Sequence, residues 1–135
     1  MTANPAYVSL GNADFISLTT FRKTGEAVST PVWIGRDGEA LIVTTPDDSG
    51  KVKRLRNNAR VEMRPSSRMG KVADDAVTVE GYAQIIGGVA GMAPLEQIIR
   101  KKYRMEYYVF MLIERIAARR QKPRVILRIT PTRAS

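Results

Sequence analysis

TTPDDSGKVKRLRNNARVEM, residues 44–63, is the most informative segment of this sequence of 135 residues. It leaves an apolar run, crosses the polar loop PDDSG and enters KVKRLRNN, where Val52 and Leu55 are three residues apart. That spacing predicts about two turns of helix with both side chains toward the core. In ARVEMRPS the alternation places Val61 and Met63 on one face, which is typical of a strand. The segment therefore predicts a strand, a loop, a helix and a strand in succession.

Three strands with short connections are expected before this helix. Turns at Gly25 and Gly38 separate them, which indicates an antiparallel meander. Pro31 cannot donate a hydrogen bond to a neighbouring strand, so we expect an edge, a bulge or a ligand at that position. The three strands are predicted at residues 15–21, 27–34 and 40–45.

The rest of the chain combines two more strands with two helices. Gly81 lies within a long strand and indicates a bulge or a barrel corner. Pro94 suits the first turn of the helix that follows. The elements after the basic helix and its strand are predicted at residues 76–86, 92–103, 106–120 and 123–129. This order predicts an α+β fold with a six-stranded antiparallel barrel. No repeat or linker is visible, so residues 1–135 are expected to form a single domain.

The second long helix carries an apolar stripe formed by Val109, Ile113 and Ile116. Such a stripe indicates a core contact or a subunit interface more often than a ligand site. A packing role is also favoured for Trp33, the only tryptophan, with a pocket wall as the alternative. Packing on a helix face is likewise favoured over substrate contact for three tyrosines: Tyr103, Tyr107 and Tyr108. The basic cluster near the C-terminus is expected to be a solvated helix end: Arg119, Arg120, Lys122 and Arg124.

Composition limits the chemistry of this chain. It has 22 Lys and Arg against 13 Asp and Glu, a formal net charge of +9, which favours an anionic partner. It has neither cysteine nor histidine, so disulfides, thiolate metal sites and imidazole-based catalysis are excluded. We expect no metal site, and an enzyme of this composition would depend on a cofactor for its chemistry.

Several partners and locations are not favoured by the sequence. Aromatic residues make up 7% and do not interleave with the basic run, and no nucleic-acid motif is present. The first residues resemble neither a signal peptide nor a transit peptide, and no apolar run approaches the ~18 residues of a membrane span. We therefore expect a cytoplasmic protein that binds no nucleic acid and has no membrane span.

The start of the basic helix has two readings. Ser49 stands where a helix N-cap is expected, and Lys51 falls in the first turn, where a cation opposes the helix dipole. A bound phosphate would reverse that unfavourable term, because backbone N–H groups, a hydroxyl and an ammonium then surround an anion. Alternatively, Asp47 and Asp48 neutralise the lysine. Both readings are open at this point.

The order FISLTTFRKTGEAVSTPVW, LIVTTPDDSGKVKRLRNNARV, AVTVEGYAQI resembles the flavin and deazaflavin oxidoreductases related to pyridoxamine 5′-phosphate oxidase. The resemblance covers roughly residues 13–130 and is strongest to the actinobacterial branch that uses the deazaflavin F420. It implies a split β-barrel, an enzyme that passes a hydride between F420 and a small organic substrate, and a homodimer with the cofactor between subunits. The alternatives are an FMN-binding oxidoreductase of the same fold and a non-catalytic cofactor-binding protein.

The resemblance also implies which residues bind the cofactor. Thr30, Pro31 and Val32 would run along the ring, while the strand end at Thr44 and Thr45 would lie near the ribityl chain and phosphate. The expected phosphate contacts are Ser49 and Lys51, with added positive field from Lys53 and Arg54. A long basic surface for an oligoglutamate tail is expected from Lys53, Arg54, Arg56, Arg60 and Arg64.

This sequence also departs from the pattern. Gly50 stands where pyridoxamine 5′-phosphate oxidases have an arginine beside the phosphate lysine. Their C-terminal substrate motif has no counterpart in PRVILRITPTRAS, so pyridoxal chemistry is not expected. No catalytic residue and no proton donor are identified.

Overall fold

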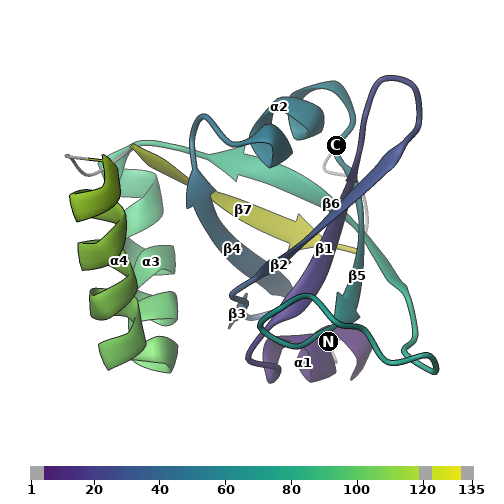
Figure 1. Ribbon diagram of the computed structural model, residues 1–135, viewed down its shortest axis with the longest axis horizontal. Helices are drawn as coiled ribbons and strands as arrows, with labels where there is room; N and C mark the ends of the chain where they lie inside the picture. Colours follow the sequence, from purple (N-terminus) through teal and green to yellow (C-terminus); the bar gives the residue numbers. More distant parts are fainter. Residues whose placement is uncertain (1–4, 119–122, 132–135) are drawn as a thin grey trace.

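The computed structural model describes residues 5–118 and 123–131. Within this part of the chain, seven strands form one antiparallel sheet in the order β2-β1-β5-β6-β7-β4-β3. The sheet curves into a half-barrel (Figure 1). The strands are β1 (Ile16–Phe21), β2 (Ala27–Val32), β3 (Gly35–Asp37), β4 (Ala40–Pro46), β5 (Arg60–Pro65), β6 (Val79–Ile86) and β7 (Arg124–Thr130).

Four helices accompany the sheet in the described residues. α3 and α4 lie side by side along one flank of the sheet, and α1 and α2 lie near its opposite ends (Figure 1). They are α1 (Pro5–Gly11), α2 (Gly50–Asn57), α3 (Val89–Tyr103) and α4 (Met105–Ala118). The α+β class predicted from the sequence is therefore confirmed.

The core forms two clusters because the sheet is covered on both of its sides. The barrel interior holds Leu18, Leu41 and Leu127, all fully buried. A second cluster, built around Ile42 and Ile99, joins α3 and α4 to the outside of β4 and β7. The inward residues predicted around the basic helix are all buried: Val52, Leu55, Val61 and Met63.

The number of strands is the main difference from the prediction. The expected strand 27–34 ends at Val32, and the short β3 follows and pairs with β4. The break occurs because the backbone of Ile34 bonds to side chains of α3 and not to a strand. Its N–H donates to Tyr103 Oη at 2.9 Å, and its carbonyl accepts from Lys102 Nζ at 2.7 Å. The six-stranded prediction is wrong by this one three-residue strand.

Gly81 is explained by helix α1, which the sequence pattern did not predict. The Tyr7 hydroxyl donates to the carbonyl of Glu80 at 2.8 Å, and a Cβ at Gly81 would collide with that hydroxyl. The β5–β6 register is continuous through this position, so the predicted bulge is wrong. β6 pairs with β5 up to Tyr82 and with β7 from Tyr82 onward, which fits the alternative of a barrel corner.

Two other boundaries differ. α3 begins at Val89, so Pro94 lies inside the helix and not in its first turn. The first turn is closed by the Met92 N–H bonding to the carbonyl of Gly88 at 3.1 Å. β6 begins at Val79 and not at residue 76, because a turn precedes it in which the Ala76 N–H bonds to the carbonyl of Ala73.

Candidate functional site

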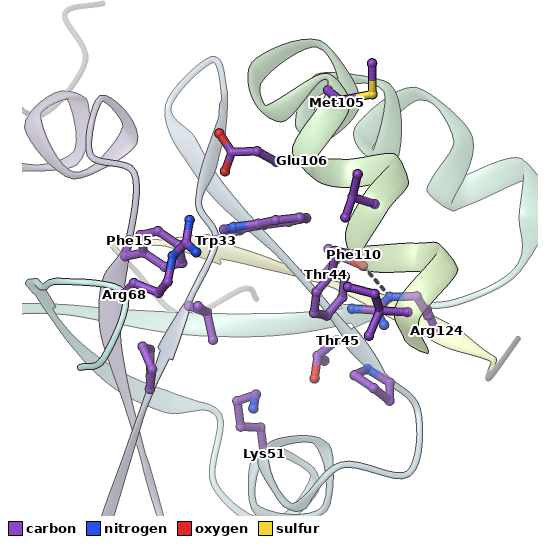
Figure 2. A pocket seen from close by; sticks show the side chains of 15 residues that line it. Phe15, Trp33, Thr44, Thr45, Lys51, Arg68, Met105, Glu106, Phe110 and Arg124 are labelled. Atoms are coloured by element: carbon purple, nitrogen blue, oxygen red, sulfur yellow. Dashed lines mark hydrogen bonds between the residues drawn. The ribbon is translucent and has the colours of Figure 1, made fainter. Parts of the chain in front are cut away.

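A cavity of about 630 Å³ opens between the sheet edge and α4. Its walls come from β2, the end of β4, the start of α2, the start of β7 and one face of α4 (Figure 2). β2 is an edge strand, and Pro31, which has no N–H to donate, lines the cavity. The volume lies in the ordinary range of small-molecule sites, roughly 300–1,000 Å³.

One end of this cavity carries hydroxyls and cations, and we call it the anion end: Thr44, Thr45, Lys51 and Arg124. Ser49 lies directly behind it as the N-cap of α2. Its Oγ accepts from the Val52 N–H at 3.4 Å and from Thr45 Oγ1 at 3.1 Å. Because Ser49 is used as an acceptor twice, its own hydroxyl proton is left to donate elsewhere.

Lys51 has no carboxylate partner among the described residues. Asp47 instead pairs with Arg56, with 3.3 Å between Oδ1 and Nη2. Burial lowers the pKa of Lys51, and the nearby Arg54 and Arg124 guanidinium groups lower it further. The reading in which Asp47 and Asp48 neutralise this lysine is therefore not supported, and an unpaired cation lies at the start of α2.

The middle of the cavity is aromatic. Trp33 stacks on Tyr103 with ring centroids 4.5 Å apart and 15° between planes, and it meets Phe110 at 5.1 Å. Trp33 and Phe110 both line the cavity, beside Pro31 and Val32. Trp33 is thus a cavity wall as well as a packed residue, while Tyr103 and Tyr107 are buried as the sequence predicted. Tyr108 meets the Tyr107 ring edge-on with centroids 5.5 Å apart but is 59% exposed, so it packs on the face of α4 and not in the core.

Two opposite charges lie at the other end of the cavity (Figure 2). Arg68 reaches it from the loop between β5 and β6, with its guanidinium carbon 5.7 Å from the centroid of the Phe15 ring. Glu106 belongs to the first turn of α4. Both residues are exposed, so this end of the cavity is open to solvent.

Five of the nine predicted cofactor-binding residues line this cavity: Pro31, Val32, Thr44, Thr45 and Lys51. Ser49 supports it from behind, as described. The other three do not line it. Thr30 keeps a buried Oγ1 with no hydrogen-bond partner among the described residues. Lys53 is exposed, and Arg54 turns away to donate from Nε to Thr20 Oγ1 at 2.6 Å.

The basic surface predicted for an extended tail is only partly present. Arg56 pairs with Asp47, and Arg60 forms ion pairs with Glu62 and Glu80, each at 2.6 Å. Arg64 donates from Nε to Thr78 Oγ1. Because these arginines already bond to other side chains of this protein, they are less available to a cofactor tail than the sequence suggested.

The sequence reading missed Arg124 and the α4 wall. Arg124 was assigned to a solvated helix end, but its side chain is only 8% exposed and forms an ion pair with Glu114 at 2.7 Å. The other members of that cluster, residues 119, 120 and 122, lie outside the described residues. The apolar stripe on α4 is not core of this chain either. Val109, Ile113 and Ile116 are 48–69% exposed, and the first two line the cavity.

The described residues contain neither a cluster of metal-binding side chains nor a helix suited to crossing a membrane. No group of three or more His, Cys, Asp or Glu side chains in residues 5–118 and 123–131 could hold a metal ion. Within the same residues, no helix combines the length and apolar character that a membrane crossing requires.

The fold defines the class of protein: an α+β split barrel with an antiparallel half-barrel sheet. The sequence matches the family model of pyridoxamine 5′-phosphate oxidase over residues 6–135, so the chain belongs to that family of flavin-binding oxidoreductases. No curated protein matches the sequence significantly.

Solved structures share the fold at low sequence identity. A protein named F420 Reductase is 21% identical with a TM-score of 0.62, and the alignment covers 97% of each chain. A conserved hypothetical protein from Mycobacterium tuberculosis is 19% identical, with a TM-score of 0.68 and coverage of 98% and 83%. An FAD-binding protein from Mesorhizobium loti is 14% identical, with a TM-score of 0.66 and coverage of 98% and 91%. At these identities, the similarity supports the fold alone.

Proposed function

We propose that this protein is an F420-dependent oxidoreductase that transfers a hydride between the deazaflavin and a small organic substrate. One observation carries the proposal: a single cavity joins an unpaired lysine at a helix start to an aromatic wall. A cofactor that carries a phosphate and a planar ring has one group suited to the lysine and another suited to the aromatic wall. The deazaflavin is taken as the first candidate because a structure named F420 Reductase aligns with this chain over nearly the whole length of both.

The described residues fit such a group. Lys51 offers a charge-assisted donor to a phosphate at the start of α2. The hydroxyls of Ser49 and Thr44 accept hydrogen bonds from Thr45 and Arg124, so each keeps its own proton as a neutral donor. Trp33, Phe110 and Val32 offer apolar surface to a planar ring. The edge of β2 at Pro31 lies beside that surface and gives the ring a flat wall.

The composition indicates that the cofactor provides the chemistry and the protein provides binding and orientation. The bound cofactor supplies the hydride chemistry. The chain's own residues would bind and orient that group: Trp33 and β2 would contact the ring, Lys51 would hold the phosphate, and the α4 side chains Val109 and Phe110 would reduce the access of water to the cavity. With no histidine in the sequence, no side chain of ordinary pKa near 7 is present to act as a base.

FMN is the second candidate cofactor, because the chain belongs to a flavin-binding family and one structural neighbour is named as FAD-binding. The two cofactors differ in their visible absorption, so the test is a competition. Purified protein is saturated with FMN and titrated with F420, and the bound fraction is read from its spectrum. We expect F420 to displace FMN. Retention of FMN at equal concentrations would assign the protein to FMN.

Activity is tested on the same preparation. Reduced F420 should be oxidised by the protein in the presence of members of a panel of quinones, enones and nitroaromatic compounds. Tight binding without oxidation by any member of the panel would favour the non-catalytic cofactor-binding alternative.

A further inference from the structure

Arg124 is a nearly buried cation at the anion end, and no sequence motif singled it out. We propose that Arg124 is a second binding residue for the cofactor phosphate and that Glu114 positions it. This inference rests on the proposed function, because it assigns a role within the same cavity.

The backbone delivers Arg124 to this position. It is the first residue of β7 and lies opposite Pro46 at the end of β4. Its Nε donates to Thr44 Oγ1 at 3.1 Å, as the dashed line in Figure 2 marks. Arg124, Thr44 and Lys51 line one cavity, so β7, β4 and α2 each bring a polar group to the same end.

The donors of Arg124 are only partly used. A guanidinium carries five N–H groups. Nε bonds to Thr44, and Nη1 donates to both oxygens of Glu114, at 2.9 and 2.7 Å. Nη2 makes no hydrogen bond to any residue in the described part of the chain. A side chain that is 8% exposed and keeps a donor nitrogen unused beside a cavity is suited to binding an anion there.

Glu114 holds the guanidinium from the α4 side. Its side chain is 13% exposed, so the pair is largely removed from water. Phe110, on the same helix, lies with its ring centroid 5.9 Å from the Arg124 guanidinium carbon. A guanidinium that is already fixed in place loses little freedom when an anion binds. The pair also connects α4, which forms one cavity wall, to the anion end.

The positive charges at the anion end favour an anion there. Lys51 and Arg124 repel each other, and Arg124 adds to the lowering of the Lys51 pKa that burial and Arg54 cause. The ion pair with Glu114 balances part of the Arg124 charge, but Lys51 has no acidic partner among the described residues. An anion between the two cations would offset the repulsion that remains, and each cation would then strengthen the other's contact.

The experiment compares each cofactor with its chromophore: FMN with riboflavin, which lacks only the phosphate, and F420 with its ribityl deazaflavin, which lacks both the phosphate and the oligoglutamate tail. The FMN pair therefore isolates the phosphate, and the F420 pair shows whether the same effect holds for the deazaflavin. The phosphate factor is the Kd of the chromophore divided by the Kd of the cofactor. Arg124→Gln removes the ion pair of the largely buried Glu114, so a double variant Arg124→Gln/Glu114→Gln provides a neutral, hydrogen-bonding replacement. Glu114→Gln alone keeps the Arg124 charge and serves as the matched control.

We expect the phosphate factor to fall about 10-fold or more in both Arg124 variants, as for a lost charge-assisted hydrogen bond. Chromophore affinity should stay within about threefold, and Glu114→Gln alone should lower the factor less than the double variant does. If chromophore and cofactor lose affinity equally, Arg124 is only structural and the inference is overturned. A wild-type protein that binds neither F420 nor FMN would refute the proposed function and, with it, this role.

Discussion

At the scale of single residues, the central feature is a lysine placed where a helix disfavours it. Lys51 lies in the first turn of α2, partly buried and without an acidic partner in the described residues. The N-cap Ser49 stabilises the helix start by accepting from the Val52 N–H, so the fold does not need the lysine there. We propose that an anionic ligand is the reason for an unfavourable cation at this helix start.

Replacing Lys51 should show how much this lysine destabilises the protein in the absence of ligand. Burial lowers the pKa of Lys51 from 10.5, so between the lowered pKa and 10.5 the unfolded chain binds more protons than the folded one. The free energy of unfolding therefore rises with pH through that window. Lys51→Met keeps the apolar stem and should be more stable than wild type at pH 7, by about 0.3–1 kcal/mol. The difference should shrink as the pH approaches 10, as followed by urea unfolding at several pH values. A variant less stable than wild type at pH 7 would contradict this.

The local part of the site could be predicted from sequence, and the non-local part could not. Ser49 and Lys51 follow from capping rules, since a helix start depends on a few adjacent residues. Arg124 is 80 residues from Thr44 and reaches it only through the β4–β7 register, which no local pattern specifies. Arg54 was misplaced for the same reason, because its partner Thr20 lies on β1, 34 residues away.

At the scale of elements, close contacts explain what the strand and helix patterns missed. The meander, the basic helix and the late helices could be read from hydrophobic periodicity, which depends on neighbouring residues. β3 could not, because side chains of α3 interrupt the strand at Ile34. α1 is short and joins β6 by one buried tyrosine, which no periodicity could have located.

Gly81 should tolerate no side chain, because α1 packs directly on it. A Cβ there would collide with the Tyr7 hydroxyl and approach Ile129 Cγ2 to 2.7 Å. We expect Gly81→Ala to lower the free energy of unfolding by about 1–3 kcal/mol, the usual cost of overpacking. Gly87→Ala is the control, since its Cβ would meet only Val125 Cγ1, at 3.9 Å. Chemical denaturation of both variants measures the difference in the free energy of unfolding. Equal stabilities would contradict the prediction, because they would show that α1 can shift away from the added methyl group without loss of stability.

Lys102 fastens α3 to the rest of the chain. Its Nζ donates to the carbonyls of Gly11, Ala13 and Ile34 at 2.9, 2.5 and 2.7 Å. Lys102→Met removes the charged donor and should destabilise the protein by about 1.5–3 kcal/mol, the range for hydrogen bonds to a charged group. The neighbouring Lys101 is exposed, so Lys101→Met should change the melting temperature little. Similar melting temperatures for the two variants would contradict the fastening role.

For the molecule as a whole, α4 presents an apolar surface that residues 5–118 and 123–131 do not cover. Tyr108, Leu112 and Ile116 follow helical spacing and are 59%, 58% and 69% exposed. Soluble monomers rarely expose contiguous apolar patches of this kind. We propose that this face joins a second copy of the chain beside the cavity that α4 lines.

A homodimer makes a direct prediction for this surface. Leu112→Lys/Ile116→Lys should convert the dimer to a monomer of half the mass in sedimentation equilibrium at micromolar concentration, because two charges cannot be buried in an apolar interface. Neither residue lines the cavity. Val77→Lys is the control, since Val77 is 74% exposed but lies in the loop before β6. A monomeric wild-type protein that binds F420 tightly would exclude the dimer.

The affinity of F420 for Lys51→Met, compared with its affinity for Lys53→Met, shows whether the lysine at the helix start binds the phosphate. The two lysines share α2, but only Lys51 lines the cavity. If Lys51 binds the phosphate, Lys51→Met should weaken F420 by about 10- to 150-fold, equivalent to about 1.5–3 kcal/mol. Lys53→Met should bind within about twofold of wild type. Equal affinities for the two variants, or no binding of F420 to the wild-type protein, would contradict the claim that this cavity holds the cofactor by its phosphate.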